Sequence, residues 1–270
     1  THTEEQLHRK IAKTLRLGNQ PFTYEIRKQS LDARHKEDKK FVYTVDIKLD
    51  NESRILKKVH DKNIMLTAEK EYHFPTPGSE TLSHRPVVIG SGPAGLFCAW
   101  YLAKAGYCPL VLERGEEADK RQETVENFWK NGILDPNSNV QFGEGGAGTF
   151  SDGKLNTAVK DPSGRNGFVL RTFVEMGADP EILYLNKPHI GTDVLRTVVT
   201  QLRKEICALG GEVRFRNRVT DFFIRDGRIN GVEINGKERL DASQVILATG
   251  HSARDTFEVL LGKPVLMKAK

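Results

Sequence analysis

The sequence predicts an α/β protein in which a Rossmann-like dinucleotide-binding domain with a β-meander follows a small ferredoxin-like α+β module. A glycine loop at 90–95 stands between an apolar strand and a helical stretch, and a second glycine-rich segment covers 143–153. Short alternating strands dominate the N-terminal part instead. The predicted organisation is an α+β module over 1–70, a linker over 71–85 and a dinucleotide-binding domain over 86–270.

The N-terminal module begins with a predicted amphipathic helix, because Leu7, Ile11 and Leu15 recur at helical spacing. Apolar and polar residues alternate over 22–26 and, more strictly, over 41–49, which predicts two strands. A short helix near 55–59 and a third strand at 64–68 follow. The order α-β-β-α-β matches a ferredoxin-like module without its first strand.

The charge of this module permits a second hypothesis about its partners. Residues 1–85 contain 17 Lys and Arg against 13 Asp and Glu, and six of the eight histidines of the chain. A mild basic excess is compatible with RNA or an acidic partner, although a solvated surface explains it more simply.

Three cysteines, Cys98, Cys108 and Cys207, lie far apart and have no metal-ligand spacing, so no metal site is predicted. No apolar run approaches the roughly 18 residues that cross a bilayer. These features favour a reducing, cytoplasmic setting. Residues 71–85 contain prolines without periodicity, which is typical of a linker, and apolar periodicity returns at Pro86.

The glycine loop gains weight from its context, since GxGxxG alone is a weak signal. A continuously apolar run at 87–89 predicts a buried parallel strand before the loop. A helix follows, with an apolar stripe expected at Ala94, Phe97, Cys98, Tyr101, Leu102 and Ala105. The next strand, 110–112, ends at Glu113.

Each residue type in this unit has a physical role. Gly90 permits a tight turn, Gly92 lets a diphosphate approach the backbone, and Gly95 lets the helix pack closely on the strand. Pro93 suits the first helical turn, whose free N–H groups attract the diphosphate. Glu113 would accept hydrogen bonds from ribose hydroxyls and repel a 2′-phosphate. The alternative is a glycine turn in a cofactor-free α/β protein.

Further elements distinguish this chain from a simple NAD domain. A helix at about 119–130 leads to the glycine-rich segment, which contains five glycines between Gly143 and Gly153 and allows close backbone approach to a ligand. A long amphipathic helix with a stripe from Leu195 to Leu209 precedes the meander. The meander is expected to start with a strand at 213–215 and to turn at 226–227 and 235–236. A last apolar strand, 245–247, runs into 248–250.

The loop at 90–95, Glu113 and the meander leading to Ala248-Thr249-Gly250 resemble the glutathione-reductase-like class of FAD proteins. More narrowly, residues 143–155 together with 250–255 are similar to a family of bacterial FAD-dependent dehydrogenases, most of whose members are uncharacterised. That family also carries an N-terminal α/β module, so the resemblance spans essentially the whole chain.

The resemblance implies FAD as the cofactor, with NAD(P)H as a candidate electron donor. It implies that Glu113 meets the adenosine ribose and that the backbone of Val219 meets the adenine, in a pocket also lined by Arg114 and Arg121. It places two further groups along the cofactor. The diphosphate group comprises Gly90, Gly92, Pro93, Ala94, Gly95, Thr249 and Gly250, and the flavin-side group comprises Gly146, Ala147, Gly148, Thr149 and Ser151.

The implied function is an FAD-dependent oxidoreductase that moves a hydride or electron pair, with its substrate unknown. One alternative is a flavoprotein whose basic N-terminal module binds RNA or another macromolecule, and another is a structural flavoprotein without turnover. The chain lacks the CxxxxC pair of disulfide reductases. It also lacks the last cofactor segment usual in this class, so we expect a fragment of a longer protein, truncated before the substrate region.

The candidate catalytic residue is His251, which follows the last apolar strand and could exchange protons near the cofactor. The alternative is that Ser252 and Asp255 start a helix beside an uninvolved histidine. His189 could line a pocket. Lys154 and Asp152 could approach the flavin, where a positive charge would stabilise its reduced anion.

Overall fold

The computed structural model describes residues 3–35, 37–68, 71–151, 153–155 and 161–268. The chain divides into two compact units, each treated by itself below. The first unit contains Thr1–His73, Asn156–Arg171 and Pro180–Pro188, and the second contains Phe74–Leu155, Thr172–Asp179 and His189–Lys270. Two segments from the middle of the chain therefore belong with the N-terminal module, although the predicted boundaries assign them to the dinucleotide-binding domain.

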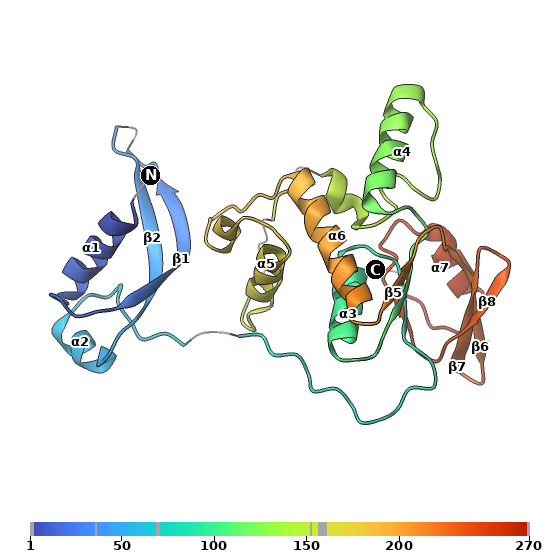
Figure 1. Ribbon diagram of the computed structural model, residues 1–270, viewed down its shortest axis with the longest axis horizontal. Helices are drawn as coiled ribbons and strands as arrows, with labels where there is room; N and C mark the ends of the chain where they lie inside the picture. The colour runs from blue at the N-terminus through green and yellow to red at the C-terminus, as the bar shows by residue number, and fades with distance from the viewer. Residues whose placement is uncertain (1–2, 36, 69–70, 152, 156–160, 269–270) are drawn as a thin grey trace. The chain divides into compact units, whose positions relative to one another are not determined.

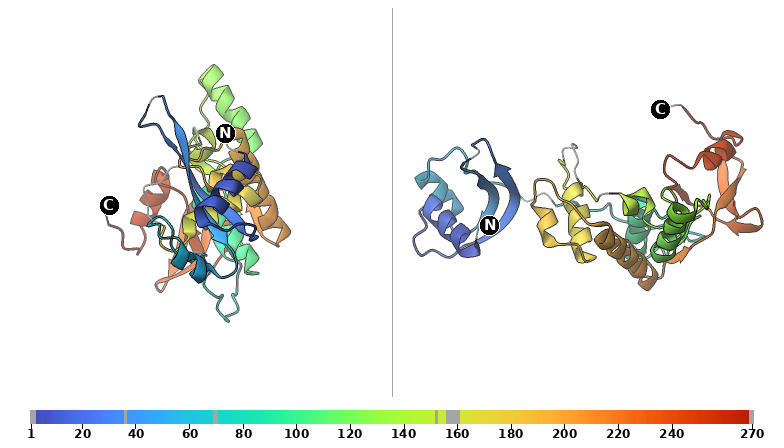
Figure 2. Two further views of the ribbon diagram at one scale, coloured as in Figure 1. Left: turned by 90° about the vertical axis from the view of Figure 1, so that its left-hand side faces the viewer. Right: turned by 90° about the horizontal axis from the view of Figure 1, so that it is seen from above.

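The first unit is built on a β-hairpin covered by a helix (Figures 1 and 2). Helix α1 (Glu4–Leu15) begins with a capping box between Thr3 and Gln6 and buries Leu7, Ile11 and Leu15, as its periodicity predicts. Strands β1 (Thr23–Asp32) and β2 (Lys40–Lys48) pair antiparallel, and α2 (Glu52–Lys58) follows. The apolar face of the hairpin and the buried face of α1 form one core.

The third strand predicted at 64–68 is wrong. Ile64 packs into the core of this unit, but Met65 and Leu66 are 71% and 60% exposed and join no ladder. A continuously apolar run forms a strand where both faces are covered, and this hairpin has one covering layer. A segment from the middle of the chain meets the edge of β1 instead. Gln29 N donates to Tyr184 O at 2.7 Å, and Asn186 N donates to Gln29 O at 3.0 Å.

The second unit is centred on a four-stranded parallel sheet with the order β5-β4-β3-β9. Its strands are β3 (Val87–Ile89), β4 (Leu110–Leu112), β5 (Glu212–Arg214) and β9 (Val245–Leu247). Helix α3 (Pro93–Lys104) connects β3 to β4 and lies beside α6 (Thr192–Ala208), which precedes β5. Between β4 and α6 the chain forms α4 (Ala118–Asn131) and the 3₁₀ helix η1 (Gly146–Phe150) in this unit. It then forms α5 (Arg165–Glu175), which is divided between the two units, and the 3₁₀ helix η2 (Pro180–Leu183), which belongs to the first unit.

The meander is a separate antiparallel sheet of β6 (Val219–Arg225), β7 (Arg228–Ile234) and β8 (Glu238–Asp241). Helix α7 (Arg254–Leu261) packs beside β6. The predicted Rossmann-like α/β fold with a β-meander is thus confirmed. One detail was wrong: β5 does not start the meander but pairs in parallel with β4 at the edge of the main sheet.

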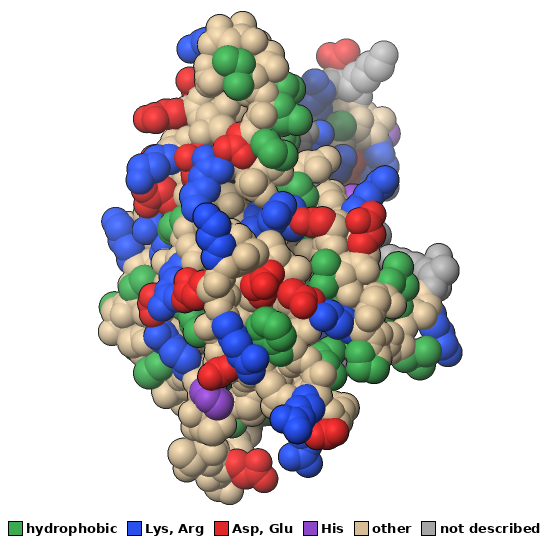
Figure 3. Space-filling view, turned by 90° about the vertical axis from the view of Figure 1, so that its right-hand side faces the viewer, with side chains coloured by type: hydrophobic (Ala, Val, Ile, Leu, Met, Phe, Trp, Pro, Cys, Tyr) green, Lys and Arg blue, Asp and Glu red, His purple; other side chains and the backbone are tan. Residues whose placement is uncertain are grey.

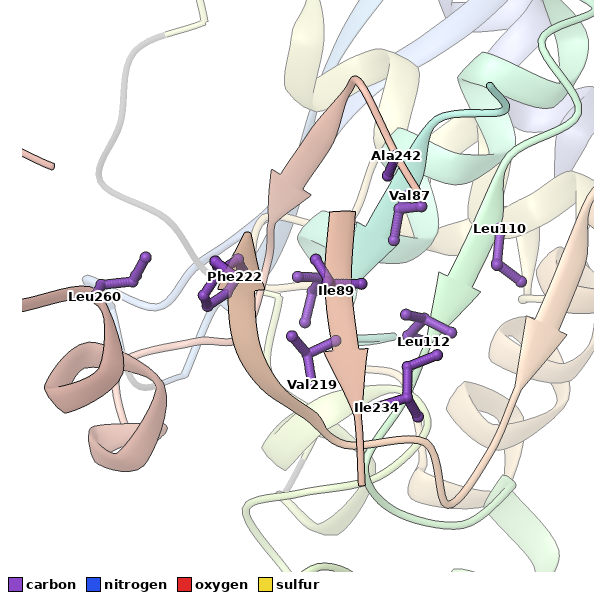
Figure 4. Close-up of a cluster of buried hydrophobic side chains, with 10 residues drawn as sticks. Val87, Ile89, Leu110, Leu112, Val219, Phe222, Ile234, Ala242 and Leu260 are labelled. Atoms are coloured by element: carbon purple, nitrogen blue, oxygen red, sulfur yellow. The ribbon is translucent and has the colours of Figure 1, made fainter. Parts of the chain in front are cut away.

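One apolar core joins the parallel sheet to the meander (Figure 4). Alternate residues of β3 and β4, namely Val87, Ile89, Leu110 and Leu112, pack with residues of the meander and α7, and each such side chain contributes about 1.5–3 kcal/mol when fully buried. The core contains Val87, Ile89, Leu110, Leu112, Val219, Phe222, Val232, Ile234, Ala242 and Leu260. This packing fixes the carboxyl ends of β3 and β4 beside the start of β6.

The buried face of α3 differs from the predicted stripe. Leu96, Ala99, Trp100 and Ala103 are buried, whereas the residues predicted to form the buried face are exposed or half-buried. The helix is apolar nearly all round, so its sequence contains no polar face that would orient it. In the stretch predicted as a linker, Phe74 stacks on Tyr101 of this helix, with ring centroids 3.8 Å apart.

Candidate cofactor-binding site

A cavity of about 620 Å³ opens at the carboxyl ends of β3, β4 and β9, where doubly wound α/β folds bind their ligands. All of its lining belongs to the second unit. The structure brings together here most of the residues that the sequence nominated. Those that line the cavity are Gly90, Gly92, Pro93, Ala94, Glu113, Arg114, Gly146, Ala147, Val219, Thr249, Gly250 and His251.

The three motif glycines have different surroundings. Gly90 adopts φ +102°, and a Cβ there would lie 2.5 Å from Ala248 O. A Cβ at Gly95 would overlap Gly90 O, so this glycine permits the helix to pack on the turn. At Gly92 the nearest atom to an added Cβ is Gly146 Cα, 4.0 Å away. Gly92 is therefore the motif glycine whose missing side chain leaves space in the cavity, next to the first turn of α3.

Glu113 lies at the end of β4 and is 4% exposed. Its Oε2 accepts hydrogen bonds from Ser91 N at 2.7 Å and Ser91 Oγ at 2.8 Å, and its Oε1 accepts one from Gly115 N at 2.9 Å. An ionised carboxylate offers about four acceptor positions, so about one remains for a ribose hydroxyl. Ser91 is fully buried. It was not nominated from the sequence because it occupies the first x position of the GxGxxG motif, which specifies no residue type.

Replacing Glu113 with Gln is expected to lower both the stability of the protein and its affinity for FAD, because the change removes a hydrogen-bond acceptor as well as a charge. The amide group of Gln would point a donor at Ser91 or at Gly115, both of which are donors themselves. We expect the free energy of unfolding to fall by about 1–3 kcal/mol and FAD to bind at least about tenfold more weakly. Urea unfolding and a flavin fluorescence titration would measure these effects. Glu123→Gln, an exposed position on α4, is the matched control, and equal affinities in the two variants would contradict the prediction.

Arg121 does not line the cavity but lies beneath the glycine-rich segment, with no exposed surface. Its guanidinium donates to the carbonyl oxygens of Asn139, Val140, Glu144 and Gly146 and to Thr149 Oγ1, at 2.7–3.0 Å. Burial lowers the pKa of Arg121 to about 10, and the nearby carboxylates of Glu113 and Glu144 oppose that change. Arg121 therefore stays charged at neutral pH, and its hydrogen bonds hold the glycine-rich segment and the residues before it in place.

The buried carboxylate of Glu144 connects the same segment to two helices. Its Oε2 accepts from Ala118 N at the start of α4 at 2.8 Å, and its Oε1 accepts from Arg203 Nε of α6 at 2.6 Å. Burial raises the pKa of Glu144, and the charge of Arg203 and the hydrogen bond from Ala118 offset this rise only in part. Gly145 N also donates to Ser91 O at 2.8 Å, so the two glycine loops are joined through their backbones.

Four other nominated residues support the cavity without lining it. Gly95 packs against the turn, and Thr149 is buried beside Arg121. Gly148 O accepts from both the backbone N–H and the hydroxyl of Ser151, which closes the end of η1. Several lining residues were missed by the sequence interpretation, namely Gln141, Phe142, Gly143, Asn217, Arg218, Ser252 and Thr256. The sequence offered a signal for some of them, since Arg218 and Ser252 each adjoin a nominated residue and Gly143 begins the glycine-rich segment.

The candidate catalytic residue and the other nominated polar residues lie in different places. His251 lines the cavity, is exposed, and has its Nε2 3.5 Å from Ser252 Oγ. His189 pairs through an isolated antiparallel bridge with Lys154, so these two candidates lie opposite each other. Asp152 lies outside the described residues. Within those residues, no group of three or more His, Cys, Asp or Glu side chains could hold a metal ion, and the three cysteines are free.

Residues 84–263 match the family described as pyridine nucleotide-disulphide oxidoreductase, which is two thirds of the chain. The chain belongs to this family. The assignment confirms the resemblance to the glutathione-reductase-like FAD-binding class. Residues 1–48 match a domain of unknown function.

The chain is also similar to several individual proteins. An uncharacterized protein of Clostridium beijerinckii is 46% identical over 98% of this chain, which spans 49% of that relative. A bifunctional thioredoxin reductase/thioredoxin of Mycobacterium leprae is 31% identical over 52% of this chain and 27% of its own length. Among solved structures, THI4 of Thermovibrio ammonificans is 20% identical, with a TM-score of 0.42 over 66% of this chain and 61% of that one. The chain thus spans half or less of the length of these two curated relatives.

In its described part, no helix is long and apolar enough to cross a membrane.

Proposed function

We propose that the whole protein is an oxidoreductase that transfers a hydride or electron pair through FAD held in the cavity of the second unit, with NAD(P)H as the electron donor. The observation that carries this proposal is the open space at Gly92, where a Cβ would project towards Gly146 across the start of α3. A diphosphate needs such an approach to free backbone N–H groups. The residues present therefore fit the cofactor.

The chain's own residues would bind and orient the cofactor along the cavity. The start of α3 would hold the diphosphate, with Thr249 and Gly250 on its other side. Glu113 would accept a ribose hydroxyl, the backbone of Val219 would border the adenine, and Gly146 and Ala147 would border the flavin side. The flavin, when bound, supplies the redox chemistry, and the protein supplies orientation and electrostatics. His251 lines the cavity and is the candidate proton donor or acceptor there.

An absorbance spectrum of the purified protein after incubation with FAD and removal of the excess tests cofactor binding. We expect the two visible flavin bands at about one cofactor per chain. Anaerobic addition of NADH or NADPH should then bleach the longer-wavelength band. A protein that retains no FAD would refute the proposal, and a bound flavin that no donor reduces would favour a structural flavoprotein.

Ion pairs in the first unit weaken the alternative of RNA binding. Arg27 pairs with Asp46 at 2.5 Å, Arg34 with Asp32 at 2.6 Å and Lys40 with Asp38 at 2.5 Å. Positive charges that are neutralised in this way attract a phosphate backbone less strongly. In the second unit, Figure 3 likewise shows basic and acidic side chains interspersed on the side of the meander. Neither observation adds support to a nucleic-acid partner.

A further inference from the structure

Two arginines and one aspartate lie at the end of the cavity next to Glu113. Arg114 and Arg218 line the cavity. Asp255, in the first turn of α7, stands behind them: Arg114 Nη2 lies 2.8 Å from each of its carboxylate oxygens, and Arg218 Nη1 lies 3.9 Å from Oδ2. One carboxylate therefore faces both of these positive charges.

Arg114 is held firmly in this position. Its guanidinium lies over the ring of Phe142, 4.3 Å from the centroid, and its side chain is 12% exposed. Partial burial raises the pKa of Asp255, but the hydrogen bond and charge of Arg114 outweigh that effect and lower it overall. Asp255 is therefore ionised at neutral pH, and its carboxylate occupies Nη2 of Arg114.

This arrangement combines two recognition elements that dinucleotide-binding folds normally use separately. An acidic residue at the end of the second strand accepts the ribose 2′-hydroxyl, whereas a nearby arginine accommodates a 2′-phosphate. Here Glu113 and Arg114 are adjacent, and Arg218 lies in the same wall. A guanidinium binds phosphate well through its planar set of donors. Without Asp255, this end of the cavity would contain two arginines able to bind a 2′-phosphate.

We propose that Asp255 is a specificity-determining residue that holds Arg114 and Arg218 away from a 2′-phosphate and so reserves the cavity for an adenosine with a free ribose. The inference rests on the proposed binding of FAD in this cavity. FAD carries no 2′-phosphate, whereas NADPH does. Asp255 therefore prevents a 2′-phosphorylated electron donor from competing for the flavin site, in addition to the repulsion by Glu113.

The test compares ADP-ribose with 2′-phospho-ADP-ribose as competitors of FAD on the full chain freed of its flavin. In the wild-type protein ADP-ribose should compete better. In Asp255→Asn, the affinity for the 2′-phosphorylated probe relative to ADP-ribose should rise about tenfold or more, as expected for one new charge-assisted hydrogen bond. Asn keeps a side-chain acceptor at the start of α7, and Asp255→Ala serves as a second variant if the first does not fold.

Two further variants separate specificity from a general change in charge. Asp241→Asn removes the same charge from the Arg239 pair of the meander, away from the cavity, and should leave the ratio of affinities unchanged. Adding Arg114→Met to Asp255→Asn should abolish the gain. An unchanged ratio in both Asp255 variants, with FAD and ADP-ribose still bound, overturns this inference alone. A wild-type protein that binds neither FAD nor ADP-ribose overturns the proposed function as well.

Discussion

Replacing Arg121 with Met is expected to lower the free energy of unfolding by about 3–5 kcal/mol, in the range seen when one member of a buried charged network is removed. Four backbone carbonyls and the hydroxyl of Thr149 would lose their common donor, and the buried carboxylates of Glu113 and Glu144 would lose a nearby positive charge. The glycine-rich segment would then lose its conformation, and FAD binding would fail with it. Urea unfolding followed by circular dichroism, together with the flavin spectrum, measures both effects.

The matched control for this prediction is the preceding residue, Lys120, on the exposed side of α4. Its side chain is 67% exposed and forms an ion pair with Glu117 at 3.0 Å. Lys120→Met should change the free energy of unfolding by no more than about 0.5 kcal/mol, as is usual for a surface substitution. Similar stabilities of the two variants would show that Arg121 does not organise the segment.

Replacing Gly92 with Val is expected to abolish FAD binding while the fold is kept. Gly92 has φ −68°, which any residue adopts, and an added Cβ meets no atom closer than 4.0 Å. The free energy of unfolding should therefore change by about 1 kcal/mol, the usual scale for an unsuitable residue at a helix N-cap. The valine side chain would nevertheless occupy the space through which a diphosphate approaches the start of α3. A colourless, cooperatively unfolding protein is the expected result.

Gly95→Ala provides the contrast, because the two glycines lie three residues apart and have opposite surroundings. An alanine Cβ at position 95 would overlap Gly90 O. This variant should therefore show a larger fall in the free energy of unfolding than Gly92→Val, and any loss of FAD binding should follow from that loss of stability. If Gly92→Val retained FAD at the wild-type level, the diphosphate could not lie at this turn. The assignment of the cavity to a dinucleotide would then be wrong.

Local patterns predicted much of the second unit correctly. The apolar strands at 87–89 and 110–112 are continuous in sequence because both of their faces are covered, and the motif between them constrains the backbone directly. The strand at 245–247 was also predicted correctly, although it lies at the edge of the sheet and is partly exposed. One wrong assignment in this unit concerns long-range pairing. Strand β5 was assigned to the meander because it precedes it, yet it pairs with β4, which lies about a hundred residues earlier.

The candidate site shows the same division. Gly90, Gly92 and Glu113 could be nominated because their roles follow from residue type and spacing. Ser91 and Asp255 could not, because each acts on a side chain distant in sequence, Glu113 and Arg114 respectively. That Arg121 supports the glycine-rich segment instead of lining the cavity could not be predicted either, because it depends on where α4 lies relative to that segment. Spacing identifies residues that meet a ligand more readily than residues that hold those residues in place.

The pairing of Gln29 with Tyr184–Asn186 also affects how the protein is made. The ribosome synthesises the β1–β2 hairpin early, but the segment that pairs with the edge of β1 is made only after β3 and β4 of the parallel sheet. The hairpin therefore spends this interval with unpaired backbone groups at that edge, which can pair wrongly with other chains. Gene fusions that transplant the first 70 residues alone would leave the same edge permanently open.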